Sequence, residues 1–502
     1  MSNNFARHLP GHRGLHMEED LLFTQSSKGL SGVDQPAPKG IKIRTGLAAR
    51  QHIGLPEVSE PQVVRHFVRL SQKNYSIDTG LFPLGSCTMK HNPRLNEKLA
   101  RLPGFADLHP LQPESTTQGA LELVHTLEHW LAELCGLPGI TLNPAAGAHG
   151  ELTGIMVIKK ALETRGDSRE IVLVSDSAHG TNPATARTCG YKVVTVASGA
   201  DGRVDYNDFK KTLDEHGNKI AAFMITNPNT CGLFEKNIRK IADDLHNIGA
   251  YFYCDGANFN AIVGKAKPGD LGVDVMQFNL HKTFSTPHGG GGPGCGPVAV
   301  CESLRPHLPT PHVVHKNGVY SLKTECAQSI GRIKAFHGHF GMMVRALAYM
   351  MSHGADGLKQ VAEDAVLNAN YVLHNLKDDY HVPYSGFCMH ECLLSDKRQK
   401  QQDISTLDIA KGLIEHGYHP MTVYFPLVVQ GAMLIEPTET EGLQSLNGFI
   451  ATMQEIARLA STEKGAEKIK HMPFSAPRRR FDEVGAARKP DLKYKPEENL
   501  DN

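Results

Sequence analysis

The sequence predicts an α/β fold in which a mainly parallel β-sheet is covered by helices on both faces. Three observations favour this fold. Six short apolar runs follow one another between residues 171 and 300, segments with helical periodicity separate several of them, and polar or titratable side chains stand where the runs end. Strands that alternate with helices indicate a parallel sheet buried on both faces. Ligands bind beyond the carboxyl ends of such strands, so a functional site is expected there.

The predicted strands and one of the helices can be placed along the chain. The strands are Ile171–Ser175, Lys192–Ala197, Ile220–Thr226, Ala250–Asp255, Val273–Asn279 and Pro297–Val300. Between the third and fourth strands, apolar residues at helical spacing mark one face of a helix, namely Ile238, Ile241, Leu245 and Ile248.

The amino-acid composition and hydrophobic pattern of the chain change near residues 120 and 330. Residues 1–120 are rich in Pro, His and Arg and predict an N-terminal arm with short helices such as Pro61–Gln72. Residues 121–330 hold the predicted sheet and form a large domain. Residues 331–502 predict a smaller C-terminal α+β domain, with helices near 340–378 and 440–463 and a polar tail. The length of 502 residues agrees with about three domains at roughly 150 residues each.

The charge balance narrows the classes of partner. The chain has 53 Lys plus Arg and 53 Asp plus Glu, so its formal net charge is zero. This balance gives no global reason to bind nucleic acid or a membrane surface. No apolar run approaches the roughly 20 residues of a membrane-spanning helix, and the start of the chain lacks a signal-peptide pattern. We therefore expect a cytoplasmic enzyme.

The ten cysteines are scattered and include no CxxC pair. This distribution predicts reduced thiols rather than a disulfide framework. Cys388, His390 and Cys392 form one short cluster of metal-ligand types, but a zinc site normally needs a second half elsewhere in the chain. No metal site is therefore expected.

Lys282 stands just after an apolar strand and before the glycine-rich run at residues 289–292. Most lysines are solvated surface groups. At the end of a buried strand, however, desolvation favours the neutral amine, which is the form that attacks a carbonyl to form a Schiff base. The glycines would let the backbone pass close to a cofactor or a neighbouring subunit, although such a run also suits a flexible loop.

Asp255 ends the strand that precedes the one before Lys282. A strand-end aspartate commonly caps the following helix. The alternative is a carboxylate that pairs with the protonated pyridine nitrogen of pyridoxal phosphate (PLP), whose ring stabilises a carbanion. The succession of strand-end Asp, one further strand and strand-end Lys is more specific than either residue alone.

A phosphate site is predicted where small residues precede a helix that runs from Glu151 to about Glu163. The segment Asn143–Gly150 exposes N–H groups and the positive end of the helix dipole. It lacks the Gly-Lys-Ser/Thr ending of a nucleotide-binding P-loop and the GxGxxG pattern of a dinucleotide site. A smaller phosphorylated cofactor is therefore favoured, and a Rossmann dinucleotide enzyme is disfavoured.

Two further strands are followed by polar residues. His179 follows the strand at 171–175 and could stack on a planar cofactor ring, or act as an ordinary turn histidine. The segment from Ile225 to Thr230 could line the same crevice, or simply build a turn.

These segments resemble the fold type I (aspartate-aminotransferase-like) PLP enzymes, and within them the glycine cleavage system P-proteins (glycine decarboxylases), in the form of the second subunit of the split, two-chain enzyme. The resemblance rests on PLGSCTMKHNP (83–93), NPAAGAHGELTGI (143–155), SDSAHGTNPATA (175–186), TNPNTCGLFE (226–235), CDGANFNA (254–261), NLHKTFSTPHGGGGPG (279–294) and AARKPDLKY (486–494). These segments span most of the chain.

The resemblance implies a role for individual residues. Lys282 would bind the cofactor covalently, Asp255 would pair with the pyridine nitrogen, and His179 would stack on the ring. The remaining expected cofactor contacts are Asn258 near the phenolic oxygen, Gly147, Ala148, Asn279 and His281 at the phosphate, and Thr230. Ser86, Cys87 and Thr88 belong to a family segment near the mouth of the site, with Cys87 not expected as a nucleophile.

The resemblance also implies a reaction and partners. Glycine would lose CO2, and its aminomethyl group would pass to the lipoyl arm of the H-protein. The chain would act with subunit 1 in a heterotetramer of two chains of each type. The alternatives are another fold type I enzyme, either cysteine desulfurase-like or aminotransferase-like, or a non-catalytic partner subunit, because fold does not fix reaction.

Overall fold

The structure is a computed structural model that describes residues 18–33, 35–36, 54–288, 294–476 and 478–494. Contacts divide the chain into two compact units, one of residues 1–79 and 470–502 and the other of residues 80–469. This division differs from the predicted boundaries at residues 120 and 330, which stay a prediction. No helix among the described residues is both long enough and apolar enough to cross a membrane.

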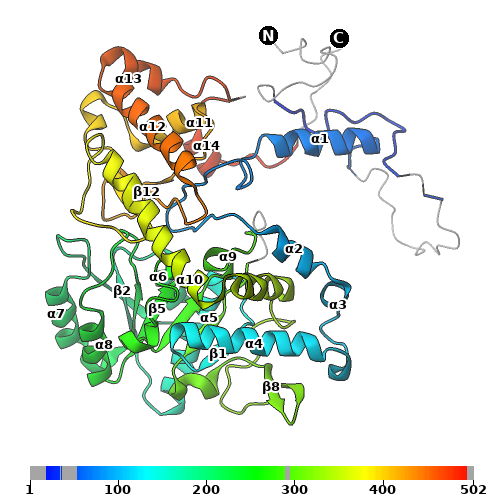
Figure 1. The fold of residues 1–502 in the computed structure, drawn as a ribbon, viewed down its shortest axis with the longest axis vertical. Helices are drawn as coiled ribbons and strands as arrows, with labels where there is room; N and C mark the ends of the chain where they lie inside the picture. Colours follow the sequence, from blue (N-terminus) through cyan, green and yellow to red (C-terminus); the bar gives the residue numbers. More distant parts are fainter. Residues whose placement is uncertain (1–17, 34, 37–53, 289–293, 477, 495–502) are drawn as a thin grey trace. The chain divides into compact units, whose positions relative to one another are not determined.

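Residues 80–469 contain the predicted α/β sheet (Figure 1). Its seven strands run in the order β1-β7-β6-β5-β4-β2-β3. Their bounds are β1 Gly139–Thr141, β2 Ile171–Ser175, β3 Lys192–Val196, β4 Ile220–Thr226, β5 Tyr251–Gly256, β6 Val275–Phe278 and β7 Val298–Val300. Only β7 runs antiparallel to its neighbours, so the prediction of a mainly parallel sheet is confirmed.

The predicted strands differ from the observed ones mainly at their ends. β2 and β4 have the predicted bounds, whereas β3 is one residue shorter, β5 is shifted by one residue and β6 loses residues at both ends. β1 was not predicted, because three residues are too few for an apolar run to stand out. It pairs with β7 at the edge of the sheet.

Helices cover both faces of the sheet because side chains alternate between the faces along each strand. In β4, Phe223 and Ile225 belong to one buried cluster together with side chains of α4, α7, α8 and α10. Ala222 and Met224 belong to the opposite cluster, with side chains of α5 and α6. The helix bounds are α4 Gln118–Cys135, α5 Gly147–Thr164, α6 Thr181–Thr188, α7 Tyr206–His216, α8 Ile238–Asn247 and α10 Phe340–Leu376.

A second, smaller sheet lies in the C-terminal part of this unit. Its three strands run in the order β10-β12-β11, with β10 at Cys392–Ser395, β11 at Thr422–Val423 and β12 at Ala432–Ile435. A two-stranded hairpin joins β8, His312–Lys316, to β9, Val319–Lys323. The other helices of the unit are α2 Arg94–Ala100, α3 Pro103–Ala106, α9 Leu280–Thr283, α11 Thr406–Glu415, α12 Leu443–Ala460 and α13 Glu463–Lys470.

Both long helices predicted in this part are present, and the first of them is kinked. Gly354 has φ 64° and ψ −175° inside α10, so the segment consists of two helices that meet at a kink. The helix predicted near 440–463 ends at Ala460, before α13 begins at Glu463. In the other unit, α1 spans Glu60–Gln72, close to the predicted Pro61–Gln72, and the short helix α14 spans Glu483–Arg488.

Candidate active site

A cavity of about 410 Å³ lies at the carboxyl ends of the parallel strands. This is the position at which α/β sheets bind their ligands. Most of its walls come from strand ends, from the first turn of α5 and from the segment around Ser86. The lining residues are Leu84, Gly85, Ser86, Cys87, Gly147, Ala148, Glu151, His179, Thr181, Thr226, Thr230, Asp255, Ala257, Asn258, Gln277, Asn279, Lys282, Thr422 and Phe425.

Lys282 stands in the cavity wall on the single-turn helix α9, directly after β6. Its Nζ donates a hydrogen bond to the backbone carbonyl of Ser86 over 2.7 Å. Ser86 itself has a positive φ of 58°, which is uncommon for a residue with a side chain. The amine is therefore held by a carbonyl whose backbone conformation must be maintained by the surrounding contacts.

Asp255 lies at the end of β5 and is 4 % exposed. Its carboxyl oxygens accept hydrogen bonds from the Asn182 amide over 3.2 Å, from the Ala257 backbone N–H over 2.9 Å and from the Gln277 amide. Three N–H donors with no acceptor among them suit the ionised form of a carboxyl group. The arrangement therefore provides a fixed negative charge on the floor of the cavity.

A second carboxyl group, that of Glu151, faces the same cavity from α5. Burial raises the pKa of Glu151 to about 7, and the neighbouring charge of Asp255 adds to the effect. The Thr181 hydroxyl donates to Glu151 over 2.9 Å and also lies 2.9 Å from Nδ1 of His179. Glu151, Thr181 and His179 thus form one hydrogen-bonded chain along the cavity wall.

His179 follows β2 and remains open to the cavity side. Partial loss of hydration lowers the pKa of His179; the charge of Asp255 opposes this shift and the charge of Lys282 adds to it. Its ring lies edge-on to Phe425, with 6.0 Å between the ring centroids. The imidazole is therefore neutral at pH 7 and presents an uncharged ring to the cavity.

The predicted phosphate segment opens α5 at Gly147, four residues before the predicted start, so the small residues form the first helical turn itself. A Cβ atom on Gly147 would lie 2.1 Å from Oδ1 of Asn279, so only glycine permits this approach. The free N–H groups of this turn face the cavity together with Ala148 and Asn279. Such a turn binds a phosphate group well.

Buried polar atoms without a partner show that the cavity is built to hold a polar ligand. Thr226 Oγ1, Asn258 Oδ1 and Asn279 Oδ1 are buried, line the cavity and form no hydrogen bond to any described residue. An unpaired buried polar atom costs free energy unless a ligand or water pairs with it. With the amine of Lys282 and the carboxylate of Asp255, these atoms fit a small, planar, phosphorylated molecule such as PLP.

Most of the residues predicted for the site meet in this cavity. Lys282, Asp255, His179, Asn258, Thr230, Gly147, Ala148, Asn279, Ser86 and Cys87 all line it. His281 and Thr88 do not. His281 packs edge-on against His288, with 5.0 Å between the ring centroids, and burial lowers its pKa to about 3. Glycines 289–292 lie outside the described residues.

Cys87 lines the cavity, with its Sγ 3.9 Å from Nε2 of His288. Burial raises the pKa of the Cys87 thiol, and burial also lowers the pKa of His288 to about 4. A neutral thiol beside a neutral imidazole is a poor nucleophile. This geometry supports the expectation that Cys87 is not a catalytic nucleophile.

Several lining residues were not predicted from the sequence. Glu151 and Thr181 lie within the quoted motifs but carry no special spacing, whereas Gln277 stands inside a strand and appears as an ordinary core position. Thr422 and Phe425 come from a distant part of the chain, near β11. No local pattern marks them, because only tertiary packing brings this segment to the cavity.

The short Cys388–Cys392 segment contributes His390 and Glu391 to a buried group of side chains that are all of metal-ligand types. The group of metal-ligand types found among the described residues is His390, Glu391 and Glu436, one ligand atom of each lying within 4.8 Å of the others. All three side chains are fully buried. Cys388 and Cys392 are buried free thiols, and none of the ten cysteines forms a disulfide.

Sequence comparisons give two matching families and close relatives. The family described as "Glycine cleavage system P-protein" matches residues 24–413, and that described as "Glycine dehydrogenase, C-terminal domain" matches residues 361–477. A "Probable glycine dehydrogenase (decarboxylating) subunit 2" of Caulobacter vibrioides is 56% identical over 497 residues, covering 97% of this chain and 94% of the relative. A protein of the same description from Bacillus licheniformis is 52% identical over 486 residues, covering 95% and 99%.

Solved structures support the fold. A glycine decarboxylase (P-protein) of the glycine cleavage system, crystallised in inhibitor-bound form, is similar with a TM-score of 0.68 and 22% identity, covering 80% of this chain and 91% of that one. A cysteine desulfurase of Thermococcus onnurineus has a TM-score of 0.59 and 14% identity, covering 76% and 95%. At these identities the likeness concerns the fold, which is that of fold type I PLP enzymes.

Proposed function

We propose a function from the premise that this chain belongs to the glycine cleavage system P-protein family. The chain is a PLP-dependent glycine dehydrogenase (decarboxylating) subunit, an enzyme that removes CO2 from glycine and passes the aminomethyl group to a lipoyl disulfide. The observation that carries this proposal is the meeting of the Lys282 amine, the Asp255 carboxylate and the helix turn at Gly147 in one cavity.

Each group in the cavity has a separate task. Lys282 would hold PLP covalently, Asp255 would pair with its pyridine nitrogen, and His179 would cover one face of its ring. Gly147, Ala148 and Asn279 would hold the phosphate, Asn258 the phenolic oxygen, with Thr230 beside them. PLP supplies the protonated ring that delocalises the electron pair left when CO2 departs.

The protein's own contribution is charge, orientation and exclusion of water. The charge of Asp255 would favour a proton on the pyridine nitrogen of bound PLP. The neutral ring of His179 would cover the cofactor without adding a positive charge to the cavity. The apolar side chains of Phe425 and Leu84, both partly buried in the cavity wall, reduce the number of waters that compete with glycine for the site.

The partners and the compartment belong to the same proposal. Glycine is the substrate, and the lipoylated H-protein carries the disulfide that accepts the aminomethyl group and is reduced. The chain works with a P-protein subunit 1, as the words "subunit 2" in the names of its relatives suggest. The assembly is a heterotetramer of two chains of each type in the cytoplasm. Ten free cysteines agree with a reducing compartment.

The decisive experiment combines labelled substrate with covalent mapping. The full chain, co-purified with its partner subunit, is loaded with PLP and given carboxyl-labelled glycine and lipoylated H-protein. Labelled CO2 should be released by the wild type and not by Lys282→Ala. Borohydride reduction followed by peptide mapping should place PLP on Lys282.

Three outcomes contradict parts of the proposal. Label on another lysine would overturn the assignment of Lys282. Transamination or desulfuration of other amino acids, with no CO2 from glycine, would favour another fold type I reaction. Full activity of this chain alone would remove the need for subunit 1.

A further inference from the structure

Three glutamates, two of them fully buried, contact the segment that contains Ser86. Glu391 precedes β10 and Glu436 follows β12, and these strands pair with Cys392 opposite Ile435. The two glutamates therefore stand opposite each other at the end of the ladder. Glu439 follows three residues after Glu436. Glu391 and Glu436 are both 0% exposed, although carboxyl groups are almost never fully buried unless paired.

Alternate residues of the segment 86–90 bind these glutamates. The Ser86 N–H donates to Glu391 over 2.6 Å, the Thr88 hydroxyl donates to Glu436 over 2.5 Å, and Lys90 Nζ donates to Glu439 over 2.6 Å. The segment is thus held at three points by glutamates that are not among the residues lining the cavity.

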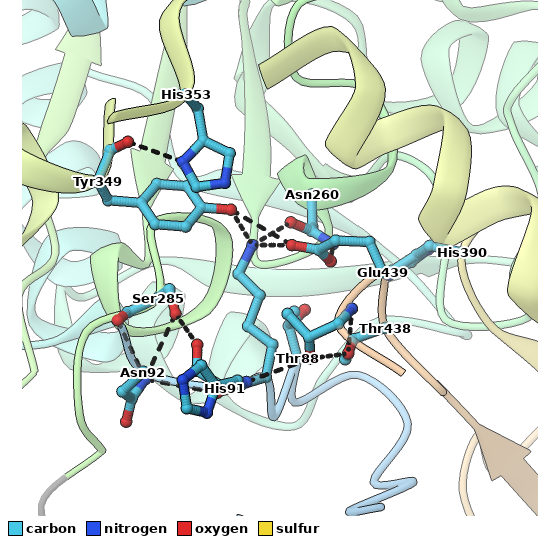
Figure 2. Close-up of polar contacts among 12 residues, drawn as sticks. Thr88, His91, Asn92, Asn260, Ser285, Tyr349, His353, His390, Thr438 and Glu439 are labelled. Carbon is cyan, nitrogen blue, oxygen red and sulfur yellow. Dashed lines mark hydrogen bonds and ion pairs between the residues drawn. The ribbon is translucent and has the colours of Figure 1, made fainter. Parts of the chain in front are cut away.

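Only the third of these contacts is a complete ion pair. Lys90 Nζ also donates to Asn260 over 2.9 Å and to the Tyr349 hydroxyl over 3.1 Å, so its three N–H bonds are all used (Figure 2). Among the described residues, neither Glu391 nor Glu436 forms an ion pair with a lysine or an arginine. A direct ion pair with lysine or arginine therefore does not explain the burial of these two carboxyl groups.

Lys282 is the cation that is linked to both glutamates through the segment 86–90. Its charge acts on both Glu391 and Glu436, and its Nζ is bonded to the carbonyl of Ser86, the residue whose N–H Glu391 holds. The positive φ of Ser86 is kept by that hydrogen bond, together with a bond from the Thr422 hydroxyl to the Gly85 carbonyl over 2.8 Å. A continuous path of contacts therefore leads from the two carboxyl groups to the amine.

Other titratable groups around the pair do not replace Lys282. His390, 3.8 Å from Glu436, is fully buried, and burial lowers its pKa to about 3, so it is neutral. Lys90 and Glu439 act on Glu436 as a pair whose charges offset each other. The thiols of Cys231 and Cys388 near Glu391 stay neutral, because burial raises the pKa of each to about 12.

We propose that Glu391 and Glu436 are positioning residues for Lys282, which keep the Ser86 carbonyl and a negative charge beside the Lys282 amine whenever that amine is free. Burial raises the pKa of both carboxyl groups, that of Glu436 to about 7, and the charge of Glu436 raises that of Glu391 further. This inference rests on the proposed role of Lys282 as the cofactor-binding lysine.

This negative charge has a defined use in the reaction. If the amine of the substrate took the place of Lys282 on the cofactor, Lys282 would become a free, basic amine and could take up the proton that the substrate ammonium group loses. The Ser86 carbonyl accepts a hydrogen bond from that amine, and the charge of the pair compensates the proton. The amine then stays at the edge of the cavity, ready to return, and does not occupy the space of the substrate.

The test measures the reactivity of Lys282 in the full chain, first without PLP. Brief acetylation with acetic anhydride across a range of pH, followed by peptide mass mapping, gives the rate for each lysine. Lys192, whose side chain is 77% exposed, serves as the internal reference. In Glu436→Gln and Glu391→Gln, loss of the negative charge should raise the rate at Lys282 about three- to tenfold at pH 7. Glu441→Gln, the same substitution five residues after Glu436, is the control and should leave the acetylation rate of Lys282 unchanged.

A second readout follows the cofactor itself. In the chain loaded with PLP and bound to its partner subunit, the pH midpoint of the visible absorbance band should shift by about half a unit to one unit in both Gln variants, as the same charge is removed. If Glu391→Gln does not fold, Thr88→Val tests the same path. It removes the hydroxyl that donates to Glu436 and should also raise the acetylation rate of Lys282.

The outcomes separate this inference from the proposed function. PLP mapped to another lysine would overturn both. PLP on Lys282, with acetylation rates and absorbance midpoints in the Gln variants within twofold and 0.2 units of the wild type, as rough limits, would overturn only the positioning role. Stoichiometric zinc or manganese in the purified chain, lost in both variants, would also overturn it, because the pair would then be metal ligands rather than positioning residues for Lys282.

Discussion

The two ends of the segment 86–90 use buried carboxyl groups in opposite ways. At the Lys90 end, a buried ammonium and the Glu439 carboxylate pair within 2.6 Å, and the remaining ammonium hydrogens are donated to Asn260 and Tyr349. At the Ser86 end, two fully buried carboxyl groups accept an N–H and a hydroxyl but have no lysine or arginine partner among the described residues.

The difference separates structural burial from functional burial. A buried ion pair in which every hydrogen bond is made has a fixed geometry and fixed charges. It attaches the segment to the helices around it. Two buried carboxyl groups without a cation of their own lower the stability of the folded chain. Proteins usually keep such unfavourable arrangements at functional sites. The unpaired end is also the end that contacts Lys282 through the Ser86 carbonyl.

Lys90→Met should have the largest effect on stability. The substitution leaves Glu439 buried without its partner, which we expect to cost about 3–5 kcal/mol of unfolding free energy. Urea denaturation followed by circular dichroism measures it. The double variant Lys90→Met/Glu439→Leu should regain a large part of the loss. A single-variant loss below about 1 kcal/mol would show that the Lys90 end is not a structural ion pair.

Gly85→Ala should disturb the Ser86 end mechanically. A Cβ atom at position 85 would lie 2.4 Å from Cγ and 2.6 Å from the backbone oxygen of Leu434 in β12, so the segment must shift away from the small sheet. We expect a loss of about 1–3 kcal/mol and weaker PLP binding. Gly119→Ala, with no atom within 4 Å, is the control and should not destabilise the chain. Equal behaviour of the two variants would contradict the close approach.

Glu436→Gln should change the pH dependence of stability. The pKa of Glu436 is raised from 4.5 to about 7 by burial, so the folded chain keeps a proton that the unfolded chain has already lost. The stabilisation is therefore fully present below pH 4.5 and is lost as the pH rises through about 7. Between pH 5 and pH 8 the wild type should lose on the order of 1–3 kcal/mol more than Glu436→Gln. Parallel curves from denaturation at each pH would rule the effect out.

Thr181→Val should give the smallest effect and test the Asp255 side of the cavity. The change removes the hydroxyl that links Glu151 to His179, while the fold around α6 stays intact. Loss of one such link predicts PLP binding weakened about three- to tenfold, measured by absorbance titration. Thr181→Ser keeps the hydroxyl and should restore binding. Unchanged affinity in Thr181→Val would mean that His179 is held by packing alone.

The sequence predicted cavity-lining residues correctly where titratable side chains stand at the ends of predicted strands. Lys282, Asp255 and His179 each follow or end a predicted strand, and parallel strands bring their carboxyl ends to one edge. His281 was expected at the phosphate only from the family resemblance. It packs against His288 and is not among the cavity-lining residues, so its role at the phosphate stays a prediction. Adjacent residues on a helical turn point in different directions, so sequence proximity alone does not place both side chains in one cavity.

The chain by itself determined the α/β class, the positions of six strands along the sequence and the group of residues that meets at their ends. Apolar periodicity and strand-end positions are local properties, readable without knowing the neighbours. Only the tertiary structure decided that Thr422 and Phe425 complete the cavity, and that Glu391 and Glu436 lie behind Ser86. These residues are more than 300 positions away from Ser86 in sequence. No local pattern encodes such contacts, because burial and charge at that range exist only once the chain has folded.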